Sequence, residues 1–503
     1  MGKRATRDVP AKKDFTRWYP YIVEAADLVD KRYPIKGMDV WRPYGLKMMR
    51  LIDGLTHREM ERTGHEEVRF PLLIPDHLLE KENRLVALLK RAREEGVDPS
   101  ELRIEDDGPG FAKEVYWVRQ AGENDLEVPM FLRPTSETAM YTMFPLWIRS
   151  HADLPLKTYQ IVNTFRYETK QTRSFIRVRE IHFFEAHTAH IDENDATRQI
   201  EEDLAIAEAI LNDLCIPAIM TKRPVWDTFP GAWYTIAIDA IMPNGRGLQV
   251  ASVHHYRDQW AKAFDITYEA LDGRQAHVHQ TTYGMSERLL GAVVGVHGDD
   301  DGLILPPAIA PIQVVVIPIL RKGTEDSVMQ FIDTHVRSLR DAGLRVKVDD
   351  REIRPGQKYY QWELKGIPLR LEVGPRDVES DQFFAARRTG GKEAIAADEL
   401  VQGVRSMLEE VASVLRIRAS DHVQSVVHPL PAFDAEAWTM ETDVEEGRIY
   451  HLPFAGTDQQ AESIERMTGL TFLGTAMEGY PTEEACPITG KLTTSKVLLG
   501  RTY

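Results

Sequence analysis

Hydrophobic positions follow two periods along the chain, and each period predicts a different kind of element. From about residue 15 to 65, and again over 78–95 and 194–214, apolar side chains recur close to the helical period of about 3.6. Short apolar runs typical of strands dominate residues 128–187 and continue to about residue 282. This region therefore predicts helices together with many short strands.

Two segments of this region stand apart from the periodic pattern. Residues 68–74 are typical of a buried strand, although the segment contains Pro71. After the helix predicted over 78–95, Gly96 and a run of Gly, Pro and Asp predict an irregular surface loop.

The pattern changes after Pro306, Pro307 and Pro311. Residues 312–317, 345–348 and 369–373 are short apolar runs separated by helical stretches, which is the alternation expected of a βαβ domain. The final part of the chain follows a polar stretch at 420–428 and offers few indications of its fold. We therefore predict three domains, at 1–310, 311–415 and 416–503.

Composition and charge limit the possible partners. The 503 residues contain 62 Lys and Arg against 78 Asp and Glu, a formal charge of -16, so a nucleic acid would have to bind at a local basic patch. The two cysteines, Cys215 and Cys486, exclude a disulfide framework and a multi-thiolate metal site. They suit a reducing compartment, and the longest apolar run, 309–320, is too short to span a membrane. We therefore expect a cytoplasmic protein.

A basic cluster stands out between residues 166 and 179. This segment contains five basic residues and a single acidic one, Glu168, which gives a local charge of +4. Two extended runs, 161–168 and 175–187, are joined by a polar turn and predict an antiparallel hairpin that carries the cluster. Guanidinium groups at fixed strand positions could hold phosphate oxygens. The alternative is an exposed hairpin with cross-strand ion pairs. The basic residues are Arg166, Lys170, Arg173, Arg177 and Arg179.

Other segments also admit two interpretations. Residues 133–138 are typical of a helix start capped by Thr135 or Ser136, with Glu137 in the first turn. Residues 284–288 lead into an apolar helix, where a lone arginine could be a snorkelling surface residue. We assign no metal to the histidines, because His182 and His187 face opposite sides of a strand. No carboxylate or thiolate set with ligand spacing surrounds them in the sequence.

Taken in order, these segments resemble the motifs of a class II aminoacyl-tRNA synthetase, and specifically of the prolyl-tRNA synthetases of archaeal and eukaryotic type. Residues 64–73, 165–185 and 284–288 resemble the three class motifs, the first of which forms the dimer. Residues 133–138 and 372–377 resemble the family's proline-binding loop and its anticodon-domain motif. The resemblance covers nearly the whole chain. It implies an α/β (α+β) protein with an antiparallel-sheet catalytic domain, a βαβ anticodon-binding domain and a small α+β C-terminal domain.

The resemblance also implies an activity, namely ATP-dependent formation of prolyl-adenylate from L-proline and transfer of the prolyl group to tRNA(Pro) by a homodimer. Arg166 is expected to bridge the proline carboxylate and the α-phosphate, Arg177 and Arg288 to bind the outer phosphates, and Glu168 the adenine end. Magnesium is expected to bridge the phosphates, and no protein nucleophile is needed. The implied proline-binding residues are Thr135, Glu137, Arg166, Phe183, Glu185, Phe229, His254, Thr282 and Gly284. The implied ATP-binding residues are Arg166, Glu168, Arg177, Gln249, Ser252 and Arg288, and the implied anticodon-binding residues are Glu363, Arg370, Arg376, Asp377 and Lys392.

The sequence departs from the family pattern in four places. Residues from about 84 to 112 form an insertion that is longer than the family leads us to expect and has no assigned role. Four positions that often hold zinc-binding cysteines are Ala455, Gln460, Cys486 and Thr489 here, so we expect no structural zinc. Val253 and Phe183 replace a small polar residue and a tryptophan. The 96 residues between His187 and Gly284 are too few for the large editing domain of bacterial-type relatives. Without editing, we expect some activation of alanine or cysteine.

Two other functions remain possible on this basis. A threonyl-, glycyl- or histidyl-tRNA synthetase shares the three motifs and a similar anticodon domain, although the loop at 135–138 favours proline. A non-catalytic tRNA-binding relative could keep the fold as a scaffold. Joint retention of Arg166, Glu168, Arg177 and Arg288 argues against it.

Overall fold

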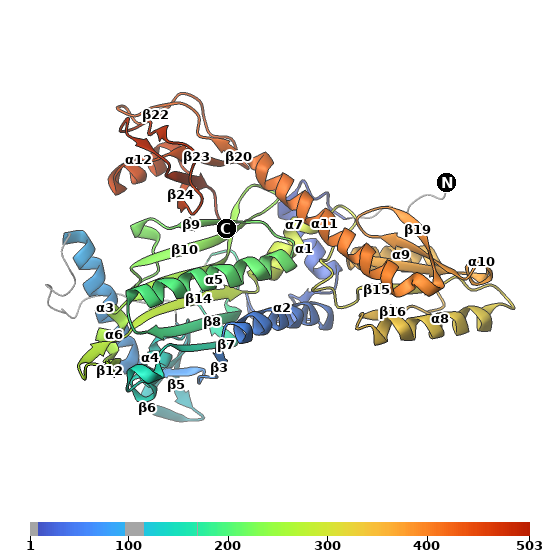
Figure 1. Cartoon of the computed structure of the whole chain (residues 1–503), viewed down its shortest axis with the longest axis horizontal. Helices are drawn as coiled ribbons and strands as arrows, with labels where there is room; N and C mark the ends of the chain where they lie inside the picture. Colours follow the sequence, from blue (N-terminus) through green and yellow to red (C-terminus); the bar gives the residue numbers. More distant parts are fainter. Residues whose placement is uncertain (1–8, 96–114, 169) are drawn as a thin grey trace.

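The computed structural model describes residues 9–95, 115–168 and 170–503. Figure 1 shows a central part built on a large sheet, a second part at the right with its own sheet, and a third part at the upper left. The long helix α11 (Leu400–Val426) runs between the second and third parts. No helix among the described residues is long and apolar enough to cross a membrane. The irregular loop predicted after Gly96 lies outside the described residues.

Six antiparallel strands form the centre of the large sheet, in the order β9-β10-β11-β14-β8-β7. The short strand β3 (Glu66–Glu67) pairs parallel to β7 at one edge. The antiparallel sheet predicted for this part of the chain is confirmed. The six strands are β7 (Leu156–Phe165), β8 (Glu180–His190), β9 (Ala218–Lys222), β10 (Tyr234–Ile241), β11 (Gly247–Arg257) and β14 (His279–Ser286).

Helices cover one face of this sheet. Helix α5 (Glu193–Asp213) packs against β8, β11 and β14, and α2 (Pro43–Arg62) packs against α5. Strand alternation explains how the other face can carry different side chains: on β8, Phe184 and Ala186 enter the core beneath the helices. Phe183, Glu185 and His187 therefore point to the opposite face, where a site can form.

Smaller elements surround the central sheet. The helices are α1 (Phe15–Ala25), α3 (Asp76–Glu95), α4 (Glu137–Trp147), α6 (Gln259–Phe264) and α7 (Arg288–His297), with short 3-10 turns at His151–Asp153 and Val225–Asp227. The strands are β1 (Val29–Asp30), β2 (Val40–Trp41), β4 (Leu73–Pro75), β5 (Trp117–Ala121), β6 (Asn124–Leu132), β12 (Thr267–Glu269) and β13 (Gln275–His277).

Two predictions for this part need correction. The continuous helical pattern over 15–65 is two helices separated by β1 and β2, because Asp27 has a left-handed φ of 68° just after α1 and Pro43 starts α2. The buried strand predicted over 68–74 is mostly irregular. Pro71 cannot donate to a ladder, and the carbonyl oxygens of Phe70 and Pro71 instead accept hydrogen bonds from Arg133 at 2.9 and 3.4 Å.

The second part has the predicted βαβ character. Its five-stranded sheet has the order β16-β15-β17-β18-β19, in which β15 runs parallel to both β16 and β17 and the remaining pairs are antiparallel. The strands are β15 (Val314–Pro318), β16 (Val346–Val348), β17 (Leu369–Val373), β18 (Gln382–Arg387) and β19 (Lys392–Ala396). The helices are α8 (Glu325–Asp341), α9 (Pro355–Leu364) and α10 (Pro375–Glu379), with a 3-10 turn at Ala397–Glu399 before α11.

The third part continues the central sheet. Strand β24 pairs with β9 through Thr475 and Ala476, so the large sheet has eleven strands. Helix α11 crosses residue 415, where the sequence divides two predicted domains. The elements of this part are β20 (Val427–Pro429), β21 (Phe433–Asp434), β22 (Thr439–Met440), β23 (Ile449–Pro453), α12 (Asp458–Thr468), β24 (Thr471–Ala476), β25 (Glu484–Ala485), β26 (Leu492–Thr493) and β27 (Lys496–Gly500).

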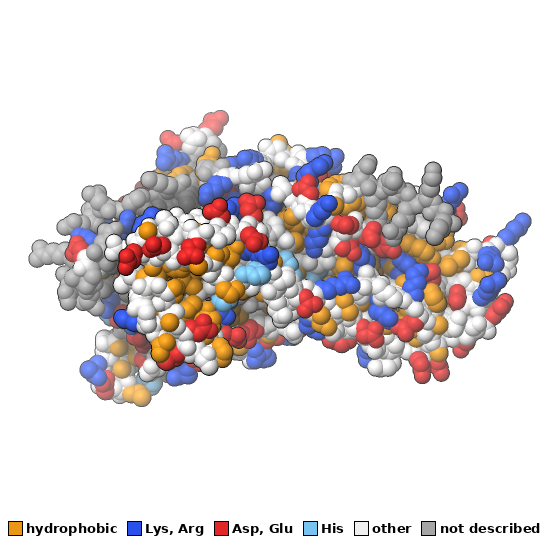
Figure 2. Space-filling model, turned by 90° about the horizontal axis from the view of Figure 1, so that it is seen from above, with side chains coloured by type: hydrophobic (Ala, Val, Ile, Leu, Met, Phe, Trp, Pro, Cys, Tyr) orange, Lys and Arg blue, Asp and Glu red, His pale blue; other side chains and the backbone are white. Residues whose placement is uncertain are grey.

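The negative net charge is not concentrated on the face shown in Figure 2. Acidic and basic side chains are interspersed there. Net charge therefore says little about where a charged partner binds, and local clusters must be considered instead.

Candidate active site

All fourteen residues that the sequence assigns to proline or ATP line one cavity of about 400 Å³, on the face of the central sheet opposite α5. They come from α4, β8, β11, β14, the start of α7 and the loops between them. The lining residues from this set are Thr135, Glu137, Arg166, Glu168, Arg177, Phe183, Glu185, Phe229, Gln249, Ser252, His254, Thr282, Gly284 and Arg288.

The basic cluster lies in a loop between β7 and β8, and the prediction that it occupies strand positions is wrong. The two strands pair up to Phe165 and Glu180, and residues 166–179 then leave the sheet. Phe175 has a left-handed φ of 61°, which interrupts the extended run. Backbone hydrogen bonds hold the loop, including one from Arg166 N to Arg179 O at 3.0 Å and one from Arg173 N to Arg177 O at 2.8 Å.

One ion pair spans this loop, as the alternative interpretation of the hairpin requires. Arg177 Nη1 lies 2.8 Å from Glu168 Oε2. Burial alone would raise the pKa of Glu168, but the Lys170 backbone N–H and the Arg177 guanidinium lower it below its usual value. Arg166 Nε donates to Pro134 O at 3.2 Å, which aims this side chain across the cavity.

Arg288 brings a third guanidinium to the same end of the cavity. It starts α7, and it donates from Nε to Ile176 O at 2.9 Å and from Nη1 to Gln249 O at 3.2 Å. It is therefore fixed by the protein rather than snorkelling toward water. Burial and the positive charges of Arg166 and Arg177 lower its pKa to about 10. Three guanidiniums that repel one another around one cavity make that end a site for an anion.

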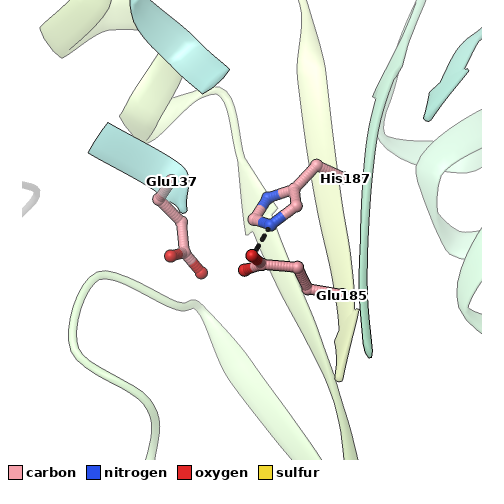
Figure 3. Close-up of side chains that lie close together, drawn as sticks. All are labelled: Glu137, Glu185 and His187. Carbon is pink, nitrogen blue, oxygen red and sulfur yellow. Dashed lines mark hydrogen bonds and ion pairs between the residues drawn. The ribbon is translucent and has the colours of Figure 1, made fainter. Parts of the chain in front are cut away.

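Two buried carboxylates occupy the other end. Figure 3 shows Glu137, from the start of α4, pointing toward Glu185 on β8. Glu137 accepts hydrogen bonds from Thr135 Oγ1 and, at 2.9 Å, from Tyr256 OH. Their proximity makes this end of the cavity a site for a positively charged group.

Five hydrogen bonds hold the Glu185 carboxylate in place, one of which comes from Thr135 Oγ1 at 3.4 Å. It accepts bonds from Ser136 N at 3.1 Å, from Gln160 Nε2 at 2.9 Å and from the Ser136 hydroxyl, and it pairs with His187 Nε2 at 3.2 Å. Burial alone would raise the pKa of Glu185, but these bonds lower it. Glu185 is therefore ionised at neutral pH.

The helix-capping interpretation of residues 133–138 accounts for only part of what is observed. Ser136 is the N-cap residue of α4, but its side chain makes no capping hydrogen bond. Its hydroxyl donates to Glu185 instead. The polar side chains of this segment therefore shape the cavity as well as starting a helix.

Aromatic side chains and a neutral histidine form the wall between the two ends. Burial lowers the pKa of His254 to about 3, and its ring nitrogens pair with Thr235 Oγ1 at 2.8 Å and Ser252 Oγ at 3.0 Å. The Phe229 ring lies 4.7 Å from the His254 ring. Val253 points into the core on the opposite face of β11, so the replacement there does not alter this wall.

Sequence reasoning missed several side chains that orient the two carboxylates. Gln160 lies directly opposite Glu185 in the β7–β8 register, His187 follows Glu185 on the same face of β8, and Tyr256 follows His254 on β11. The period of two already places His187 on the same face as Glu185, although no role was assigned to it, and the same period along β11 could have indicated Tyr256. Gln160 could not be found in this way, because its position depends on the strand register.

Comparisons with known proteins agree with this arrangement. The family model described as "tRNA synthetase class II core domain (G, H, P, S and T)" matches residues 116–297, and the model "Anticodon binding domain" matches residues 313–407. The proline--tRNA ligases of Thermococcus kodakarensis and Pyrococcus horikoshii are 47% and 46% identical to this chain over 98% of each protein. The chain belongs to the proline--tRNA ligase family. A solved structure of Giardia lamblia prolyl-tRNA synthetase in complex with prolyl-adenylate has a TM-score of 0.88 and 33% identity over 98% of this chain and 99% of that chain.

Three side chains of the cavity form a possible metal site. Glu137, Glu185 and His187 each offer a ligand atom, and these atoms lie within 4.8 Å of one another. The expectation that no carboxylate set surrounds the histidines is thus wrong for His187. His182 faces the other way, as predicted, and pairs with Asp53 at 2.8 Å. Because the family acts on an amino acid, the ammonium group of that substrate also suits this carboxylate pair.

The residues expected at the anticodon lie in the second part, and several are paired with one another. Arg370 on β17 pairs with Glu363 at 3.3 Å and Glu372 at 2.9 Å, and Lys392 lies 3.7 Å from Glu372. The Arg370 guanidinium lies 4.0 Å from the Tyr359 ring centre. These contacts match the alternative interpretation of a salt-bridged sheet.

Two more expected anticodon residues lie at the end of β17. Arg376 and Asp377 belong to the short helix α10, where Asp377 Oδ2 accepts a hydrogen bond from Gly374 N at 2.8 Å. Arg376 is exposed. A charged ligand could therefore reach Arg376 from solvent, whereas Asp377 also serves as a helix cap.

The four positions that resemble zinc ligands lie in the third part and make protein contacts. Thr489 Oγ1 donates to Ala455 O at 3.4 Å, and Gln460 Oε1 accepts from Thr457 N at 2.9 Å as part of a capping box on α12. Cys486 is buried. Only one of the four side chains is a thiol, which fits poorly with a tetrahedral zinc site.

Proposed function

We propose that this protein activates L-proline with ATP to form prolyl-adenylate and then transfers the prolyl group to tRNA(Pro). The observation that carries the proposal is the charge pattern of one cavity. Arg166, Arg177 and Arg288 lie at one end, and Glu137 and Glu185 lie at the other. Proline carries an ammonium and a carboxylate, and ATP carries a triphosphate, so this pattern suits both substrates with their reacting ends together.

In the proposed mechanism, the proline carboxylate attacks the α-phosphorus in line and pyrophosphate leaves. The reaction needs no protein nucleophile, because the substrate supplies one. Glu137 and Glu185 hold the ammonium, Arg166 lies between the reacting groups, and Arg177 and Arg288 neutralise charge on the leaving phosphates. Binding energy is thus directed to positioning and charge stabilisation.

Magnesium is proposed to accompany ATP, where it would neutralise negative charge on the phosphates. Among the acidic residues that line the cavity, Glu287 suits contact with the ion. Its Oε2 is buried and has no hydrogen-bond partner among the described residues. A carboxylate oxygen is a preferred magnesium ligand.

We further propose that Glu363, Arg370, Arg376, Asp377 and Lys392 read the anticodon, where single-stranded bases suit such side chains. The ion pairs that Arg370 and Lys392 make within the domain would then break when RNA binds. A substitution of Arg376 is expected to weaken aminoacylation of tRNA(Pro) while leaving pyrophosphate exchange intact. Equal aminoacylation by the variant and the wild type would count against this assignment.

A homodimer and a cytoplasmic location complete the proposal. Leu72 and Leu73, at the end of the segment that resembles the dimer-forming motif, are exposed apolar side chains of the kind that protein interfaces cover. Sedimentation of the purified protein tests this, and a monomer at micromolar concentration would contradict it. The substrates ATP and tRNA support the cytoplasmic location.

Pyrophosphate exchange with each amino acid in turn is the decisive experiment for the reaction. We expect strong ATP-dependent exchange with proline and weaker exchange with cysteine or alanine. The interval between His187 and Gly284 is occupied by α5, α6 and strands β9 to β13, which supports the absence of an editing domain in this chain. Exchange with threonine, glycine or histidine instead would identify another class II synthetase, and no exchange at all would favour a non-catalytic relative.

A further inference from the structure

Helix α3 carries one buried carboxyl group that the proposed mechanism does not use. The buried face of α3 includes the apolar side chains of Leu79, Leu85 and Leu89. Glu82 lies on this same face and is only 2% exposed. A charged residue at a core-facing position of an amphipathic helix breaks the expected pattern and calls for a physical reason.

The surroundings of Glu82 are apolar on both sides. Leu79 packs with Phe131 in one cluster, and Leu85 packs with Met140 and other side chains of α4 in a second cluster. Burial there raises the pKa of Glu82 to about 7. An apolar side chain would fill this position without the penalty of burying a carboxyl group.

One contact links Glu82 to the candidate active site. Thr138 Oγ1 donates a hydrogen bond to Glu82 Oε2. Thr138 is the second residue of α4 and directly follows Glu137, whose carboxylate points into the cavity. The first turn of α4 is therefore held from two directions: Tyr256 and Thr135 hold it from the cavity, and Glu82 holds it from α3.

We propose that Glu82 is a positioning residue for amino-acid recognition, which fixes the first turn of α4 through Thr138 and so aims Glu137 at the substrate ammonium. This inference rests on the proposed function. It assigns a role in substrate binding to α3, a helix that supplies none of the predicted cavity residues. Loss of the contact should affect proline and leave the nucleotide end of the cavity unchanged.

The test uses three variants of the full chain and pyrophosphate exchange. Glu82→Met keeps the length of the side chain and removes its hydrogen-bonding oxygens, Glu82→Gln keeps a hydrogen-bonding end, and Glu80→Gln changes an exposed residue of the same helix as a control. We expect Glu82→Met to raise KM for proline about tenfold, with KM for ATP within about twofold of wild type and a Tm that does not fall. Glu82→Gln should restore most of the affinity for proline, and Glu80→Gln should match wild type.

Two outcomes would overturn the inference. One is an unchanged KM for proline in Glu82→Met, and the other is an equal rise of both KM values with a lower Tm, which indicates a purely structural role. If Glu82→Met fails to fold, Thr138→Val decides the question, because it replaces the hydroxyl with a methyl group of similar size and is expected to show the same selective rise in KM for proline. A wild-type protein that gives no proline-dependent exchange would overturn the proposed function itself, and that result is distinct from a failure of the variants.

Discussion

Replacing Tyr256 by phenylalanine tests whether the hydrogen bonds around the carboxylate pair set the affinity for proline. Tyr256 is fully buried on β11, and its hydroxyl donates to Glu137 Oε1 at 2.9 Å and accepts from Thr282 Oγ1 at 3.0 Å. Phenylalanine deletes this one oxygen. The ring can keep its contact with Trp260, whose centroid lies 5.5 Å away, so the packing of the wall is preserved.

The size of the effect follows from the charge of the acceptor. A hydrogen bond to a charged group contributes about 1.5 to 3 kcal/mol. Part of the lost free energy lowers the stability of the folded protein, because Glu137 is misaligned in the absence of substrate too. If about half of this free energy is lost from the binding of proline, KM for proline rises roughly three- to twelvefold, since about 1.4 kcal/mol corresponds to a factor of ten. The ATP end should be unaffected, because the hydroxyl contacts only Glu137 and Thr282 among the described side chains.

Pyrophosphate exchange measured against proline and against ATP gives both KM values. Tyr159→Phe is a matched control, because Tyr159 is also buried and its hydroxyl pairs with His57 Nδ1 at 2.8 Å, away from the cavity. It should lose some stability and keep its KM for proline. Equal KM values for proline in the two variants would refute the reasoning.

Three further predictions concern Arg288, Asp203 and zinc. Arg288→Lys cannot reproduce the two hydrogen bonds to Ile176 O and Gln249 O, so we expect kcat/KM for ATP to fall about 100-fold in exchange assays. Burial raises the pKa of Asp203 to about 8, so the folded protein retains a proton that the unfolded chain releases above about pH 4. Stability should therefore be lost as the pH rises toward 8, by at most about 1.4 kcal/mol per pH unit from this group, and urea titrations of Asp203→Asn should lack that contribution. Metal analysis of chelator-treated protein should find no tightly held zinc, and one zinc per chain would contradict this.

Strand alternation made much of the candidate site predictable. A period of two fixes which side chains share a face, so the sequence alone is enough to group Phe183, Glu185 and His187. The βαβ alternation after residue 311 likewise needed only local patterns. A conformation set by a single residue could not be predicted in this way. Phe175, the first residue of the second expected strand, has a left-handed φ, and residues 175–179 lie in a loop before β8 begins.

Contacts between segments that are distant in the sequence could not be predicted from local patterns. Gln160 reaches Glu185 because two strands pair in one particular register, which no single segment specifies. Glu82 was included in a charged helix, and nothing in the sequence separated its environment from that of the exposed Glu80. The hydrogen-bond partners of a buried polar group can be identified only in the folded structure, because burial depends on what packs against each helix.

The join between the third part and the central sheet gives a physical reason to expect a stable fold without zinc. A small domain that lacks an adequate core often depends on a metal for its folding energy. Here Leu473 on β24 accepts hydrogen bonds from Thr221 Oγ1 at 2.7 Å and Arg223 Nη1 at 2.8 Å, and Arg223 also pairs with the buried Asp239 at 2.8 Å. Arg223 lines the cavity, so the same contacts that hold the third part also form a wall of the candidate active site. Replacing Arg223 should therefore both loosen the third part and weaken substrate binding, whereas chelation should do neither.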